Sequence, residues 1–99
     1  MEIENEDHTY VESSRDGAVM LELDKDGNAL RVQLEPAVNA TWTADILADR
    51  LLRLHTLALM RARSDQLARM NERGANMPPD DVYPSKSEIT AYRAQYVDF

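Results

Sequence analysis

The chain has 99 residues, no cysteine, two histidines and a formal net charge of −7. This length allows one small domain with a thin core, so we expect help from a partner subunit. The absence of cysteine excludes disulfides, thiolate catalysis and cysteine-based zinc sites. His8 and His55 lie far apart in the sequence without any metal-ligand spacing, and we expect neither a metal nor a cofactor.

The charge is distributed unevenly along the chain. Residues 1–36 hold ten acidic and three basic side chains, whereas residues 37–74 hold four acidic side chains and six arginines. Because a mostly acidic surface repels phosphates, we do not expect nucleic acid as a partner. No apolar run is long enough to span a membrane and the acidic N-terminus differs from a signal peptide, which predicts a soluble, cytoplasmic protein.

The first third of the chain reads as a small sheet. Residues 1–7 form an acidic lead-in without periodicity, and three alternating segments follow at about residues 9–11, 18–24 and 29–35. The turns "RDG" and "DKDGN" separate them, and Pro36 ends the last one. This pattern predicts a three-stranded antiparallel meander with one inward apolar face, made of Val19, Leu21, Leu23, Leu30, Val32 and Leu34.

One long helix is predicted from about Trp42 to about Arg73, capped by Thr41 or Asn39. Its apolar residues form two stripes on the helical wheel. The broad stripe contains Leu47, Ala48, Leu51, Leu52, Leu54, Ala58, Leu59 and Ala62, and the narrow stripe contains Ile46, Leu57 and Met60. Three short strands cannot cover both stripes, so we expect a homodimer formed through the long helix, the edge strand or both. The predicted dimer or partner interface comprises Ile46, Leu47, Leu51, Leu54, His55, Leu57 and Met60.

The last quarter of the chain is predicted to be a linker and a short helix. Residues 75–84 are rich in proline and acidic side chains, which indicates an extended linker after a domain at 8–74. Ser85 and Glu88 have the spacing of a capping box for an amphipathic helix within residues 85–99. The apolar tail residues Ile89, Tyr92, Tyr96 and Phe99 either dock on their own domain or form a partner-binding surface.

Together these elements predict an α+β fold of three strands, one long helix and a short C-terminal helix. The segment from Val11 to Met70 resembles the meander and long helix of the YbaB/EbfC-like family, with its "G-x-V-x-V" and "L-x-x-V-x-L-x-P" strands. The matching positions are Gly17, Val19, Leu21, Gly27, Leu30, Val32, Leu34, Pro36, Ile46, Leu47 and Leu51. These motifs are structural and support the fold more than a function.

Two departures from that family affect what the resemblance implies. The long N-terminal helix of the nucleoid-associated members is missing, and this chain is acidic where they use basic patches. The chain is more similar to a divergent actinobacterial branch of small acidic proteins associated with type VII (ESX) secretion, the EspH-like proteins, which also end in a tail such as "YRAQYVDF". That similarity implies a cytoplasmic chaperone or adaptor for secretion substrates, and the alternative is a degenerate DNA-binding protein of the YbaB type.

No residue pattern indicates catalysis, and we expect a protein that is not an enzyme. His55 lies inside the broad stripe, where it is either a hydrogen-bonded interface residue or a pH-sensitive one. The six arginines of residues 50–73 form either a basic stripe or, with interleaved aspartates, a solvated face with pairs such as Asp49 and Arg53. Trp42 is predicted to pack at the edge of the sheet.

Overall fold

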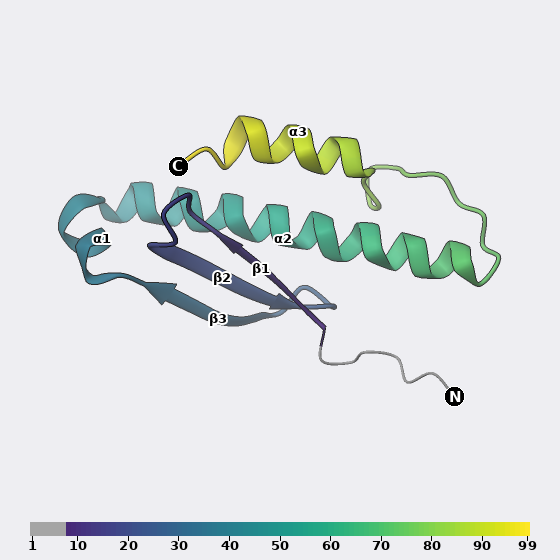
Figure 1. Cartoon of the computed structure of the whole chain (residues 1–99), viewed down its shortest axis with the longest axis horizontal. Coiled ribbons are helices and arrows are strands. Elements are labelled where there is room, and N and C mark those ends of the chain that lie inside the picture. Colours follow the sequence, from purple (N-terminus) through teal and green to yellow (C-terminus); the bar gives the residue numbers. More distant parts are fainter. Residues whose placement is uncertain (1–7) are drawn as a thin grey trace.

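A computed structural model describes residues 8–99 of the chain, and the predicted lead-in at residues 1–7 lies outside this part. Its α+β class and order of elements confirm the prediction (Figure 1). The elements are β1 (Thr9–Ser13), β2 (Val19–Asp24), β3 (Ala29–Leu34), α1 (Pro36–Thr41), α2 (Ala44–Glu72) and α3 (Lys86–Tyr96). The molecule is elongated along α2, with principal extents of 50 × 29 × 18 Å.

The predicted long helix from about Trp42 to about Arg73 corresponds to α2, and a short helix that was not predicted, α1, precedes it. Pro36 opens α1 instead of only ending the strand, because its fixed φ angle suits the first turn of a helix. The side chain of Thr43 caps α2 by accepting a hydrogen bond from the Ile46 amide at 3.2 Å. The prediction of Thr41 or Asn39 as the cap was therefore wrong, and the Thr41 hydroxyl donates to the Ala37 carbonyl within α1.

The sheet has the predicted antiparallel order β1-β2-β3. Val19 lies opposite Leu34 and Leu21 opposite Val32, so these four side chains share one face. A bulge between Glu22 and Leu23 shifts the register at the start of β3. The pairing of β2 with β3 is thus regular toward Leu34 and irregular near Leu30.

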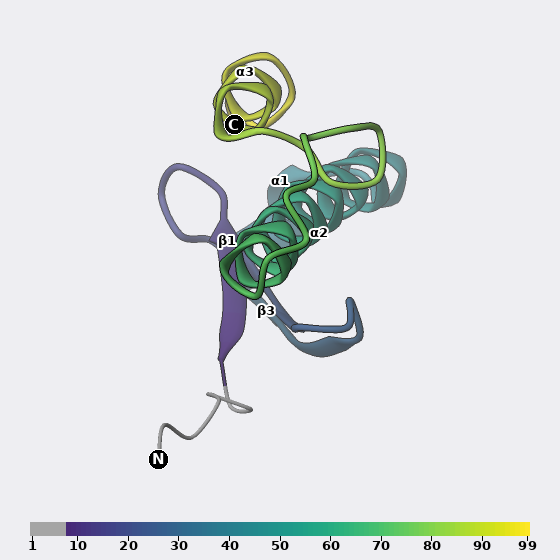
Figure 2. The same cartoon turned by 90° about the vertical axis from the view of Figure 1, so that its right-hand side faces the viewer.

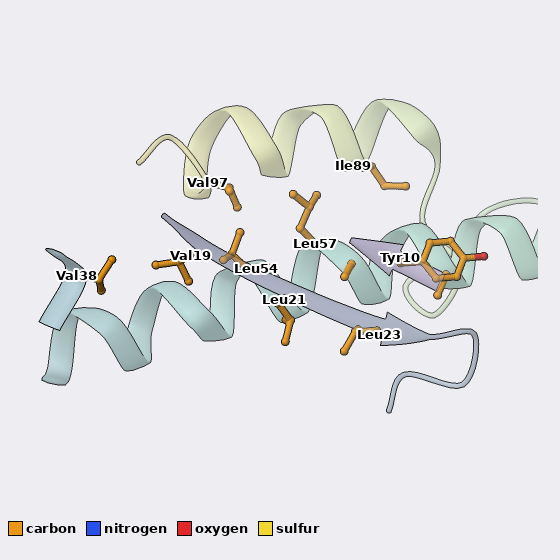
Figure 3. Close-up of a cluster of buried hydrophobic side chains, with 11 residues drawn as sticks. Tyr10, Val19, Leu21, Leu23, Val38, Leu54, Leu57, Ile89 and Val97 are labelled. Atoms are coloured by element: carbon orange, nitrogen blue, oxygen red, sulfur yellow. The ribbon is translucent and has the colours of Figure 1, made fainter. Parts of the chain in front are cut away.

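The core lies between this face of the sheet and α2. Val19 and Leu23 of β2 and Leu54 of α2 are fully buried, and Tyr10 of β1 is nearly so (Figure 3). Gly27, in the turn between β2 and β3, has a φ of +90° and approaches α2 so closely that a Cβ would lie 3.0 Å from Leu59 Cδ1. The turn therefore requires glycine for both its conformation and its contact.

The C-terminal helix α3 covers the opposite side of α2 from the sheet (Figures 1 and 2). Ser85 caps it as predicted, accepting a hydrogen bond from the Glu88 amide at 3.2 Å. Leu57 of α2 is fully buried and points toward α3, near the buried Ile89 and Val97 (Figure 3). Leu57 of the narrow stripe thus packs toward the chain's own C-terminal helix, which leaves less of α2 for a partner.

The residues after α3 are attached to the domain by hydrogen bonds and cation–π contacts. The backbone carbonyl of Phe99 accepts a hydrogen bond from the Arg15 amide at 2.6 Å, and the Arg15 guanidinium donates to the Asp98 carbonyl at 2.7 Å. The Arg50 guanidinium lies 4.3 Å from the centre of the Trp42 ring and 4.9 Å from that of Phe99. These contacts hold the tail against the junction of α1 and α2.

Candidate protein-interaction surface

An apolar surface is left uncovered between β3 and the N-terminal half of α2. We call it the open face and define it by Leu21, Val32, Leu34, Ala48, Leu51, Leu52 and His55. Six of these residues, all except Leu34, line a groove of about 390 Å³. Val32 is 46% exposed, Leu34 40% and Leu52 67%. Exposed apolar side chains that adjoin one another in this way are typical of interaction sites.

The open face exists because α2 lies over β1 and β2 and not over β3. The buried residues of the sheet belong to β1 and β2, whereas all six residues of β3 are exposed. Val32 and Leu34 still face the helix side, since they lie opposite the buried Leu21 and Val19. The prediction that Leu30, Val32 and Leu34 belong to the core of the chain was therefore wrong about their burial.

The predicted interface residues of α2 divide into three groups. Leu54 and Leu57 are fully buried in the chain's own core, which corrects their assignment to a partner interface. Leu47 and Met60 are partly buried against that core, and Ile46 is 43% exposed. Leu51 and His55 line the groove of the open face and stay candidates for contact with a partner.

The predicted partner-binding tail packs on its own domain in this structure. Ile89 is buried, and Tyr92 and Phe99 pack against the core. Tyr96 is 39% exposed, and its ring lies 4.8 Å from that of Tyr92. Of the two possibilities that the sequence left open, the structure therefore supports docking on the chain's own domain.

The residues that make the open face distinctive were not predicted from the sequence. Leu52 and Ala48 belong to the broad stripe, but nothing in the stripe shows which of its members the sheet will leave exposed. Val32 and Leu34 have the alternation of buried strand residues. The signal that could have identified them is the width of the broad stripe, because one helix packs only part of such an arc against a three-stranded sheet.

The other edge strand, β1, is anchored by an ion cluster that was not predicted from the sequence. Glu12 of β1 is only 5% exposed, and its carboxylate pairs with Arg61 of α2 and, at 3.0 Å, with Arg93 of α3. A buried carboxylate is stable only when such partners compensate its lost hydration. The Glu12 cluster therefore ties the first strand to both helices.

The arginines that were weighed as a basic stripe mostly bind other parts of the chain. Arg53 pairs with Asp49 at 3.0 Å, as predicted, and Arg61 pairs with Glu12. Arg63 donates to the Gln66 side chain, while Arg50 stacks on aromatic rings. These arginines contact other residues of the same chain. The contacts therefore favour a solvated, internally paired face over a basic stripe.

A second, polar hollow of about 420 Å³ lies where β1 meets α2 and α3. The Tyr10 hydroxyl donates to the Asp65 carboxylate there at 2.9 Å, and the His8 imidazole lies 3.9 Å from the same carboxylate. Burial and the neighbouring Asp65 raise the pKa of Tyr10 above its ordinary value, although the nearby Arg69 opposes this shift. A phenol with a raised pKa is a poor proton donor or nucleophile at neutral pH.

The part of the chain that the structure describes contains no group of three or more histidine, cysteine, aspartate or glutamate side chains arranged to hold a metal ion. Within residues 8–99, no helix combines the length and the apolar composition that crossing a membrane would require. Comparisons with models of protein families, with curated proteins and with solved structures found no match to this chain.

Proposed function

We propose that this chain is a non-enzymatic protein-binding module that acts in the cytoplasm as a chaperone or adaptor. The observation that supports this function is the open face, an apolar groove of about 390 Å³ with His55 as its one polar lining residue. Such a surface suits the apolar stripe of an amphipathic helix, which inserts side chains at intervals of three and four residues. Leu52, at 67% exposure, would be the main contact of such a helix.

A link to type VII secretion is part of this proposal. It rests on the resemblance of the meander, the long helix and the tyrosine-containing tail to the EspH-like proteins. The docking of the tail on the domain gives that tail a structural role here, so cargo binding is assigned to the open face. The proposed partners are secretion substrates with an exposed amphipathic helix.

Affinity capture from a lysate of the native organism tests the proposal when three forms are compared. The wild type and two charge variants, Leu52→Glu on the open face and Ala68→Glu at an exposed position elsewhere on α2, would be used as bait. We expect mass spectrometry to find proteins bound by the wild type and Ala68→Glu but lost with Leu52→Glu. Equal recovery by all three forms would show that the open face does not bind these proteins.

DNA binding, the alternative function, predicts a complex whose affinity depends on salt concentration. A YbaB-type protein would shift duplex DNA at low salt and release it as salt rises, because the contact depends on phosphate neutralisation. The internal pairing of Arg53 and Arg61 and the net charge of −7 favour the protein-binding function. We therefore expect no mobility shift even at low salt.

A further inference from the structure

We propose that the free edge of β3 pairs with β3 of a second copy of this chain, in antiparallel orientation, with Gln33 facing Gln33 across a two-fold axis. The pairing would join two three-stranded sheets into one sheet of twice the width. This inference rests on the proposed function, because a second copy of the chain would bind at the edge of the open face.

The backbone of β3 offers unpaired groups along its outer edge. The Glu35 amide donates to the Ala18 carbonyl at 2.8 Å, so the amide of Glu35 points toward β2. Because these directions alternate along an antiparallel strand, the amides and carbonyls of Val32 and Leu34 point away from β2. All six residues of β3 are exposed, and none of them is a proline. An edge of this kind is a template for another strand.

The side chains favour a pairing centred on Gln33. This centre places Arg31 opposite Glu35 of the second copy and Val32 opposite Leu34, so charges and apolar side chains are matched. A centre on Arg31 would bring the two Arg31 side chains together, and a centre on Val32 would require the irregular residue Leu30 in the ladder. An axis between two residues would place the apolar face of one copy beside the polar face of the other.

Pairing at this edge also changes the open face. Since the sheet face is shared, Val32 and Leu34 of both copies would lie side by side on the side where both α2 helices lie. The two grooves would become the two halves of one apolar trough, with a Leu52 at each flank. The binding surface is therefore incomplete in one copy and completed by the other.

Cysteine cross-linking tests the axis directly, because the chain has no cysteine of its own. Gln33→Cys should form a disulfide-linked dimer rapidly under mild oxidation, since residues on the two-fold axis have adjacent Cβ atoms. Ala91→Cys, at an exposed position on α3, is the matched control. We expect the Gln33→Cys variant to cross-link at least tenfold faster, and equal rates would overturn the proposal.

Charge reversal provides a second test that does not depend on a disulfide. Glu35→Arg should weaken the association measured by sedimentation velocity, because it places two cations opposite each other, and adding Arg31→Glu should restore it. A monomeric wild type at all concentrations, with equal cross-linking of the two cysteine variants, would refute the pairing. If Leu52→Glu still abolished protein capture in that case, the proposed function would stand without the dimer.

Discussion

The two edge strands of the sheet, β1 and β3, have opposite surroundings. Tyr10 and Glu12 of β1 are buried beneath α2, and the Glu12 cluster connects that strand to α2 and α3. Val32 and Leu34 of β3 face the same side and are uncovered. The difference shows that apolar alternation, as in β3, does not determine whether a strand is covered, whereas contacts with distant residues, as in β1, do.

The physical cause of this difference is the position of α2. Its attachment through Tyr10 to Asp65 and through Glu12 to Arg61 draws the helix toward β1. The helix is too narrow to cover all three strands, because a helix with its side chains is about 10 Å wide, whereas three strands at about 4.8 Å each are about 14 Å wide. A helix held over β1 and β2 therefore leaves the residues of β3 exposed.

The strongest test of this contrast compares two leucines that are two residues apart on α2. Leu54→Ala should lower the free energy of unfolding by about 3 kcal/mol, because it creates a cavity at a fully buried site. Leu52→Ala, on the open face, should change it by less than about 0.5 kcal/mol in a dilute sample. Urea unfolding followed by circular dichroism measures both values, and equal losses would contradict the assignment of a covered side and an open side.

The Glu12 cluster provides the next largest effect. Glu12→Ala should destabilise the fold by about 2 kcal/mol, because it leaves Arg61 and Arg93 without their shared acceptor. Glu22→Ala removes the carboxylate that pairs with Arg31 at 3.3 Å on the other face of the sheet. That more exposed pair should contribute less than about 1 kcal/mol, and thermal unfolding of both variants would show the ranking. A larger loss for Glu22→Ala would mean that β1 is not the anchored edge.

The turn at Gly27 is expected to have a smaller effect on stability. Gly27→Ala should cost about 1 to 2 kcal/mol, because φ is +90° and the added Cβ meets Leu59. Gly17→Ala is the matched control, since its φ is +76° and no atom lies within 4 Å of the added Cβ. The difference between their unfolding midpoints measures the effect of the contact between the turn and α2. Identical midpoints would show that this contact does not affect stability.

The smallest expected effect is a dependence on pH at the same turn. Hydrogen bonds from the Asn28 backbone and side chain hold the pKa of Asp24 below its ordinary value of 3.8. This carboxylate therefore contributes stability above that value, and the contribution is lost as pH falls through the lowered pKa. Asp24→Asn should flatten the fall of the unfolding midpoint in acid below about pH 4. If the unfolding midpoint of Asp24→Asn fell with pH as steeply as that of the wild type, Asp24 would not be the cause of the acid destabilisation.

The sequence was sufficient for the elements whose signals are local. The three strands, the Ser85 cap and the pair of Asp49 with Arg53 were all predicted, because each depends on neighbours within a few residues. The short helix α1 was not predicted, since Pro36 was read as a stop instead of a helix start. Periodicity alone cannot distinguish these two roles of proline.

The candidate surface was only partly predictable. Leu51 and His55 were identified from the helical wheel, whereas Leu54 and Leu57 were assigned to a partner although the chain itself buries them. Their burial depends on where α3 and the sheet pack, and those contacts join residues far apart in the sequence. The ion pair of Glu12 with Arg93, across 81 positions, is one such contact.

The most direct test of the contrast between β1 and β3 is amide hydrogen exchange measured residue by residue at low and high protein concentration. If β3 is the contact edge, the amides of Val32 and Leu34 should become protected as concentration rises, because a second strand would then accept their hydrogen bonds. The amides of β1 should exchange at the same rate in both samples. Exchange at Val32 and Leu34 that does not change with concentration would contradict the account.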